Sequence, residues 1–174
     1  MGIGNVRLGA PALILLSGVP GVGKTTFARA LGARLPLQHI ESDALRRRLF
    51  AHPRYTSWEH RSVFAAVERE LTGTLGGGRI ALVDATNLRH AHRQRFFKIA
   101  ERHGAVTVSV RLVAPDAVVR ERLRGPREGF SQADERVYEL LRGGEEPFRT
   151  PVVVVDTRFA LEPALRLVER LLAG

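Results

Sequence analysis

The sequence contains no cysteine, which excludes disulfide bonds and thiolate metal sites. Long apolar runs are also absent, because no segment approaches the ~20 residues that a membrane-spanning helix requires. Residues 1–10 lack the basic start and the apolar segment of a signal peptide. From these absences we expect a cytoplasmic protein with no membrane partner.

Lysine is almost absent: the chain has only Lys24 and Lys98, so nearly all of its positive charge, net +9, is arginine. A basic chain can indicate an anionic partner such as nucleic acid. A chain that is also rich in alanine, leucine, valine and glycine equally fits a bias of the coding sequence, with many arginines solvated and ion-paired. The charge alone therefore favours a polyanionic partner only weakly.

Glycines cluster just before Lys24, in a match to the pattern G-x-x-x-x-G-K-[ST]. An apolar run at 12–16 precedes the match and helical spacing at 27–35 follows it, which is the context of a phosphate-binding P-loop. In such a loop backbone N–H groups surround phosphate oxygens, Lys24 reaches the β- and γ-phosphates and Thr25 ligates Mg²⁺. The alternative is a glycine-rich turn with an incidental lysine. The predicted nucleotide-binding residues are Gly18, Val19, Pro20, Gly21, Val22, Gly23, Lys24, Thr25 and Thr26.

Strand and helix patterns alternate along the chain, which is typical of an α/β fold with a mainly parallel sheet. We expect one P-loop domain over residues 1–174, folded as a three-layer sandwich with a five-stranded sheet between helices. The expected strands cover residues 12–17, 37–40, 80–84, 107–113 and 152–155. The expected helices cover residues 24–35, 44–50, 58–75, 90–103, 115–124, 131–141 and 162–172.

Polar residues follow the expected strands at their carboxyl ends. The P-loop follows the first strand, Ser42 and Asp43 follow the second, Asp84 ends the third and Asp156 follows the last. In open parallel α/β sheets, ligands bind outside the carboxyl ends of the strands, so these groups should converge on one crevice. This convergence favours an enzyme over a passive nucleotide binder.

Asp43 is the candidate general base, because phosphoryl transfer to an alcohol needs an acceptor for the proton of the hydroxyl. Arg46 lies one helical turn further on the same face, where it can neutralise the transferred phosphoryl group or bind an acceptor phosphate. The alternatives are a helix N-cap for Asp43 and, for Arg46, membership of a solvated charge run at 46–48.

Asp84 ends an apolar strand, where a second carboxylate acts on Mg²⁺ through water or holds the acceptor hydroxyl; the alternative is a cap for the next helix. Further along, the loop at 122–129 carries Arg122, Arg124 and Arg127 around a Gly-Pro break at 125–126. This stretch predicts a mobile lid over residues 122–131 that closes arginines over the phosphates. An ordinary exposed basic loop is the alternative.

The scattered histidines and the larger aromatic residues carry no predicted chemistry. His90 and His92 are two residues apart, whereas a helical metal pair needs a spacing of four, so we expect both on the surface. Trp58 and Phe64 follow an expected N-cap at Ser57 with helical spacing. We therefore expect both rings in the core rather than in a base-stacking platform.

Together these segments resemble the P-loop kinase family of the polynucleotide kinase domain, a group that includes small ATP-dependent kinases and is similar to zeta toxins and chloramphenicol phosphotransferase. The resemblance covers nearly the whole chain. The P-loop is common to many enzymes, whereas S-D-x-x-R at 42–46 and D-A-T-N at 84–87, with Arg93 beyond, are more specific. The resemblance implies a parallel sheet in the order 2-3-1-4-5.

In that family the aspartate that matches Asp43 accepts the proton of the 5′-hydroxyl, and the arginine that matches Arg46 contacts the acceptor phosphate. The aspartate that matches Asp84 helps to position the acceptor. The resemblance also places Asn87 and Arg93 among the substrate-binding residues.

The resemblance further implies that lid arginines hold the donor phosphates, and we place these at Arg122 and Arg127, with Arg124 able to replace either. We therefore predict an ATP- and Mg²⁺-dependent kinase. The net charge and the D-x-x-R motif favour a nucleic-acid or nucleotide 5′-hydroxyl as the acceptor. The alternative is a small-molecule kinase acting on an antibiotic, a sugar or a nucleotide-sugar. A nucleotide-binding switch is a third possibility, but a switch needs no base. The predicted catalytic residues are Lys24, Asp43, Arg46, Arg122 and Arg127.

Overall fold

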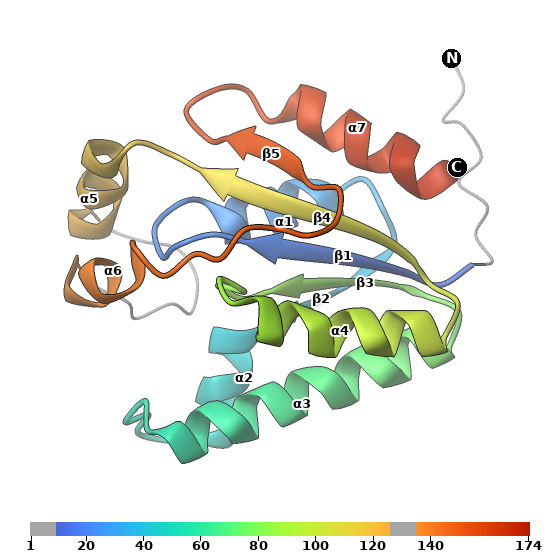
Figure 1. The fold of residues 1–174 in the computed structure, drawn as a ribbon, viewed down its shortest axis with the longest axis horizontal. Coiled ribbons are helices and arrows are strands. Elements are labelled where there is room, and N and C mark those ends of the chain that lie inside the picture. Colours follow the sequence, from blue (N-terminus) through green and yellow to red (C-terminus); the bar gives the residue numbers. More distant parts are fainter. Residues whose placement is uncertain (1–9, 126–134) are drawn as a thin grey trace.

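A parallel sheet is the framework of the structure, a computed structural model that describes residues 10–125 and 135–174. Five strands lie in the order β2-β3-β1-β4-β5, and all the neighbouring pairs are parallel. The predicted order and direction are thus confirmed (Figure 1). The strands are β1 (Ala12–Ser17), β2 (Leu37–Glu41), β3 (Ile80–Asp84), β4 (Val106–Val113) and β5 (Val153–Asp156).

Helices cover both faces of this sheet, which confirms the three-layer sandwich (Figure 1). They are α1 (Lys24–Gly32), α2 (Ser42–Leu49), α3 (Ser57–Gly76), α4 (His90–Arg102), α5 (Asp116–Arg124), α6 (Glu135–Leu141) and α7 (Glu162–Ala173). One apolar core joins Ile14 and Leu16 of β1 to α1 and α7, and a second joins Leu13 and Leu15 to α3 and α4. Within 10–125 and 135–174, no helix is long and apolar enough to cross a membrane.

The start of α3 differs from the sequence prediction. The N-cap is Thr56 rather than Ser57, and its hydroxyl accepts a hydrogen bond from the backbone N–H of Glu59 at 3.2 Å. Phe64 is buried as predicted, but Trp58 is 61% exposed, so its placement in the core was wrong. Trp58 belongs to the first turn of a 20-residue helix and packs edge-on against Phe50, with ring centres 5.4 Å apart. The first turn of α3 thus extends past the sheet, which does not cover the side chains of that turn.

Two buried polar side chains, Asn87 and Arg93, form a hydrogen-bonded cluster after β3. Asn87, at φ +48°, has no exposed surface and donates from Nδ2 to the carbonyl oxygen of Leu16 at 2.7 Å. Arg93 is also fully buried, and its guanidinium donates to the carbonyl oxygens of Asn87, Leu88, Glu146 and Pro147 at 2.8 to 3.0 Å. These bonds fasten the segment between α6 and β5 to the start of α4. Backbone carbonyls thus engage the guanidinium of Arg93 and Nδ2 of Asn87, whereas Oδ1 of Asn87 has no hydrogen-bond partner among the described residues. Their assignment to substrate binding stays a prediction.

Replacing Arg93 with methionine should lower the free energy of unfolding by about 3 kcal/mol or more, because four carbonyl groups lose a buried donor. Urea unfolding monitored by circular dichroism measures the loss. Arg95→Met on the same helix is the control, since that side chain is half exposed and forms a surface ion pair with Glu68. Equal losses in the two variants would contradict the structural role of Arg93.

Candidate active site

A cavity of about 1100 Å³ opens where β1, β2 and β3 end. It brings together the P-loop, Asp43, Arg46, Asp84 and Arg122, which are widely separated in the sequence. The P-loop, Ser42, Asp43 and Asp84 thus converge as predicted, whereas Asp156 does not line this cavity and pairs with Arg158 at 2.6 Å. Sites for one small ligand usually measure ~300–1,000 Å³, so this cavity has room for a nucleotide and a second small molecule.

The P-loop follows a tight path that two of its glycines permit. Gly18 has φ +151° and Gly21 has φ +77°. A Cβ on Gly18 would lie 2.8 Å from the carbonyl oxygen of Leu112, and a Cβ on Gly21 would lie 2.8 Å from the side chain of Leu123. The loop leads directly into α1, which begins at Lys24. The free N–H groups of that first turn are the donors that phosphate oxygens need.

Lys24 folds back onto its own loop. Its Nζ donates to the carbonyl oxygens of Gly18 and Val19, each at 3.0 Å. Burial lowers the pKa of Lys24, whereas the carboxylates of Asp84 and Asp43 act in the opposite direction. The Lys24 ammonium thus lines the cavity, and phosphate oxygens can replace its carbonyl partners.

Thr25 and Asp84 form a pair of oxygen ligands that fits Mg²⁺. The Thr25 hydroxyl donates to Asp84 Oδ2 at 3.0 Å, and His39 Nε2 lies 3.2 Å from the same oxygen. The N-cap of α4 is Arg89, so Asp84 is not the helix cap that the sequence left open. Hydroxyl and carboxylate oxygens are the ligands that Mg²⁺ prefers, and here they adjoin the phosphate cradle. The sequence analysis missed His39, because its contact depends on the pairing of β2 with β3.

Two further carboxylates line the cavity near the start of α2. The N-cap of α2 is Glu41, without a side-chain cap bond, so the cap interpretation of Asp43 is wrong. Within the part of the chain that the structure describes, the Asp43 carboxylate forms no hydrogen bond or salt bridge. Glu41 pairs in register with Asp84, and burial followed by the charge of Asp84 raises the pKa of Glu41. The sequence analysis missed Glu41, although it ends β2 as Asp84 ends β3.

Arg46 behaves differently from the two arginines that follow it. It is 4% exposed, whereas Arg47 and Arg48 are exposed, so the solvated-run interpretation fails for Arg46. Its Nη2 lies 3.1 Å from His60 Nδ1, and its guanidinium carbon lies 4.6 Å from the centre of the Tyr55 ring. One turn of α2 therefore carries both Asp43 and Arg46 to the cavity.

The starts of α3 and α4 supply a wall that the sequence analysis missed. Tyr55, His60, Phe64 and His92 line both the main cavity and an adjoining hollow of about 420 Å³. His92 was expected on the surface, but its ring is half-buried, 4.9 Å from the ring of Phe64. Burial lowers the pKa of both His60 and His92, which keeps both imidazoles neutral near pH 7. No sequence spacing joins 55–64 to His92, because only the packing of α3 on α4 brings them together.

Arg122 joins the P-loop to the loop after β5. Its Nη1 donates to the hydroxyl of Thr157 at 2.9 Å and its Nη2 donates to the carbonyl oxygen of Thr157 at 3.0 Å, while that hydroxyl donates to a P-loop carbonyl at 2.8 Å. Arg122 lines the cavity and Arg124 does not. Arg127 and residues 126–131 of the predicted lid lie outside the described residues.

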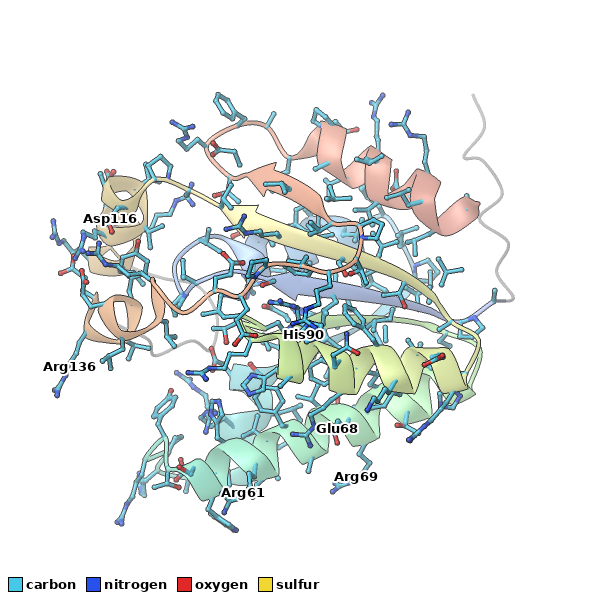
Figure 2. All side chains as sticks on the ribbon, viewed as in Figure 1. Arg61, Glu68, Arg69, His90, Asp116 and Arg136 are labelled. Atoms are coloured by element: carbon cyan, nitrogen blue, oxygen red, sulfur yellow. The ribbon has the colours of Figure 1, made fainter. Side chains whose placement is uncertain are left out.

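Asp116 ties α5 to α6 at one side of the cavity (labelled in Figure 2). Its carboxylate accepts hydrogen bonds from Arg120, Tyr138 and Arg142 at 2.7, 2.8 and 3.1 Å. Arg120 first and Tyr138 second lower the pKa of Asp116 to about 2. The anchored α6 contributes an apolar strip to the cavity, which includes the exposed side chain of Leu140.

The sheet order, the glycine cradle and the Thr25–Asp84 pair define a P-loop nucleotide-binding protein of the α/β class. The chain belongs to the protein family described as AAA domain, whose match covers residues 13–147.

Solved structures of other proteins share this P-loop kinase fold. Kti12 from Chaetomium thermophilum, in complex with ADP-AlF3, is 23% identical, with a TM-score of 0.73 over 91% of this chain and 95% of that chain. APS kinase from Mycobacterium tuberculosis, in complex with AMPPNP and APS, is 16% identical, with a TM-score of 0.72 over 95% and 99%. A gluconokinase from Sinorhizobium meliloti is 22% identical, with a TM-score of 0.69 over 94% and 92%. These likenesses show the fold alone and do not single out polynucleotide kinases, zeta toxins or chloramphenicol phosphotransferase.

Replacing Asp84 with asparagine should raise the Mg²⁺ concentration needed for tight ATP binding about tenfold or more, because the carboxylate orients Thr25 and the ion. Binding of a fluorescent ATP analogue at graded Mg²⁺ concentrations measures the shift. Without Mg²⁺ the variant should bind ATP at least as well as the wild type, since a negative charge is removed. Asp156→Asn, at the end of β5, is the matched control. Equal weakening of binding with and without Mg²⁺ would contradict a role for Asp84 at the metal.

Proposed function

We propose that the protein is an ATP- and Mg²⁺-dependent phosphotransferase that moves the γ-phosphate of ATP to a hydroxyl group of a small molecule. The observation that supports this most strongly is a carboxylate, Asp43, that shares one cavity with the P-loop and has no hydrogen-bond or salt-bridge partner among the described residues. A nucleotide-binding switch has no use for such a group. Asp43 lies one turn from Arg46, whereas Glu41 lies beside Asp84, so Asp43 is the carboxylate on the acceptor side.

The residues divide the reaction between them. Lys24 and the N–H groups at the start of α1 bind the β- and γ-phosphates, and Thr25 with Asp84 holds Mg²⁺. An ion held by these two residues would neutralise charge on the phosphate oxygens. Asp43 accepts the proton of the acceptor hydroxyl as the oxygen forms its bond to the γ-phosphorus and the bond to ADP breaks. Arg122, already beside the P-loop, stabilises the charge on the transferred group.

A small acceptor fits this cavity better than a nucleic-acid end. The acceptor side is walled by Tyr55, Phe64 and His92. Part of the basic charge that favoured nucleic acid is engaged in surface ion pairs, for example between Arg34 and Glu169 and between Arg111 and Glu145. The similar gluconokinase and APS kinase are named for small acceptors.

Replacing Asp43 with asparagine should lower kcat roughly 10²- to 10⁴-fold, because the hydroxyl proton loses its acceptor, and should leave the affinity for ATP nearly unchanged. The assay supplies labelled ATP and Mg²⁺ with a panel of sugars, sugar acids and nucleosides and with a 5′-hydroxyl oligonucleotide. Asp156→Asn is the control of the same chemistry.

Labelling of the oligonucleotide alone would overturn the small-molecule proposal in favour of the polynucleotide kinase interpretation. Tight ATP binding without transfer to any compound of the panel would favour the switch. Undiminished transfer by the Asp43→Asn variant would remove Asp43 as the base and leave Glu41 as the next candidate.

A further inference from the structure

The two oxygens of the Asp84 carboxylate have different surroundings. Oδ2 accepts a hydrogen bond from the Thr25 hydroxyl at 3.0 Å and lies 3.2 Å from Nε2 of His39. Oδ1 has no hydrogen-bond partner among the described residues. Because Asp84 lines the cavity, Oδ1 is the oxygen that is left for a ligand, while two side chains from other elements hold Oδ2 in place.

His39 reaches Asp84 through the pairing of β2 with β3. In this parallel register Glu41 is the partner of Asp84, and His39 is the partner of Leu82. Side chains alternate between the two faces of a strand, so His39 lies on the same face of β2 as Glu41. Asp84 is therefore the diagonal neighbour of His39 on the adjacent strand. The length of the imidazole brings its far nitrogen, Nε2, across this diagonal to Oδ2.

His39 is the donor in this contact and has no direct access to a ligand. An ionised carboxylate can only accept hydrogen bonds, so Nε2 of His39 carries a proton and donates it to Asp84. The side chain of Asp84 is 3% exposed, so this bond lies at a nearly buried oxygen. His39 is not among the residues that line the cavity. It can therefore act on a bound ligand only through Asp84.

The metal site that we place at Thr25 and Asp84 has few ligands from the protein. In residues 10–125 and 135–174, no group of three or more histidine, cysteine, aspartate or glutamate side chains is arranged to hold a metal ion. Mg²⁺ is commonly bound through one or two carboxylates, with water and phosphate oxygens in the other positions of a near-octahedral shell. A site with so few fixed oxygens depends on their orientation. The direction of the Asp84 carboxylate is thus a property that a neighbouring donor can control.

Building on the proposed function, we propose that His39 is a positioning residue whose Nε2–H holds Asp84 in the orientation in which Asp84 and Thr25 bind Mg²⁺ together with ATP. Loss of a hydrogen bond behind a metal ligand typically lowers metal affinity roughly 10- to 100-fold. His39 would therefore determine the Mg²⁺ concentration at which ATP binds tightly and would leave the contacts of the P-loop with phosphate unchanged. A bond that served only the fold would change stability and not the Mg²⁺ requirement.

Two amide variants separate the donated hydrogen bond from the rest of the ring. His39→Gln places an amide nitrogen near the position of Nε2 and keeps the donor, whereas the amide of His39→Asn ends near Nδ1 and falls short of Asp84. Gln38→Asn is the matched control, because it shortens an exposed side chain on the opposite face of the same strand. For each variant, binding of a fluorescent ATP analogue is measured without Mg²⁺ and at graded Mg²⁺ concentrations.

His39→Asn should raise the Mg²⁺ concentration that gives half of the full gain in ATP affinity about tenfold, whereas His39→Gln and Gln38→Asn should stay within about threefold of wild type. Without Mg²⁺, all the variants should bind ATP as the wild type does, which a general structural defect would not allow. No shift in His39→Asn, or equal shifts in His39→Asn and His39→Gln, would overturn the proposal. ATP binding by the wild type that did not respond to Mg²⁺ would overturn both the metal site and the role of His39.

A double-mutant cycle tests whether His39 acts through Asp84. The His39→Asn change should have little further effect on the Mg²⁺ requirement once Asp84→Asn is present, and an equal effect in both backgrounds would overturn the proposal. These binding measurements do not depend on phosphate transfer. A Mg²⁺ requirement that His39 controls, in a protein that transfers phosphate to no acceptor, would support the role of His39 and overturn the phosphotransferase. An unchanged requirement in His39→Asn, beside transfer that depends on Asp43, would overturn the role of His39 alone.

Discussion

The strand β1 is buried at every residue from Ala12 to Ser17, and this burial constrains where the active residues can lie. A strand with apolar side chains on both faces is stable only in the interior of a sheet that helices cover on both sides. Its neighbours β3 and β4 run parallel to it, so the carboxyl ends of all of them meet at one edge. The P-loop and Asp84 are adjacent for this reason, and the hydrogen bond between Thr25 and Asp84 follows from the register of β1 and β3.

The hydrogen bonds of Asn87 and Arg93 extend this constraint to the side of the cavity on which we place the acceptor. Asn87 bonds the turn after β3 to the end of β1, and Arg93 fixes the first turn of α4 against the segment before β5. His92 is the neighbour of Arg93 and faces the cavity. Arg93 thus has no exposed surface, yet it fixes the turn of α4 that places His92 at the cavity.

The donor half of the site could be predicted from sequence because its parts are contiguous. Nine consecutive residues from Gly18 to Thr26 carry the loop, the lysine and the threonine that we propose as a metal ligand. The glycines of this segment are needed for local backbone reasons. The acceptor half could be predicted only in part. Asp43, Arg46 and Asp84 were identified from strand ends, but Tyr55, His60 and His92 reach the cavity through the packing of α3 on α4, which no local pattern encodes. Trp58 failed for the same reason, because helical spacing specifies a face and not how far the sheet extends beneath it.

Charge is separated across the cavity in a way that orients its ligands. Glu41 and Asp84 lie beside the P-loop, where Lys24 and a divalent ion would balance them, and burial, followed by the charge of Asp84, raises the pKa of Glu41. Arg46 lies with neutral imidazoles and a protonated phenol, where a second cation would be repelled and an anion attracted. Asp43 stands between these two surroundings, on the helix that carries Arg46. A hydroxyl that approaches Asp43 would thus lie between the carboxylates beside the P-loop and the cation at Arg46.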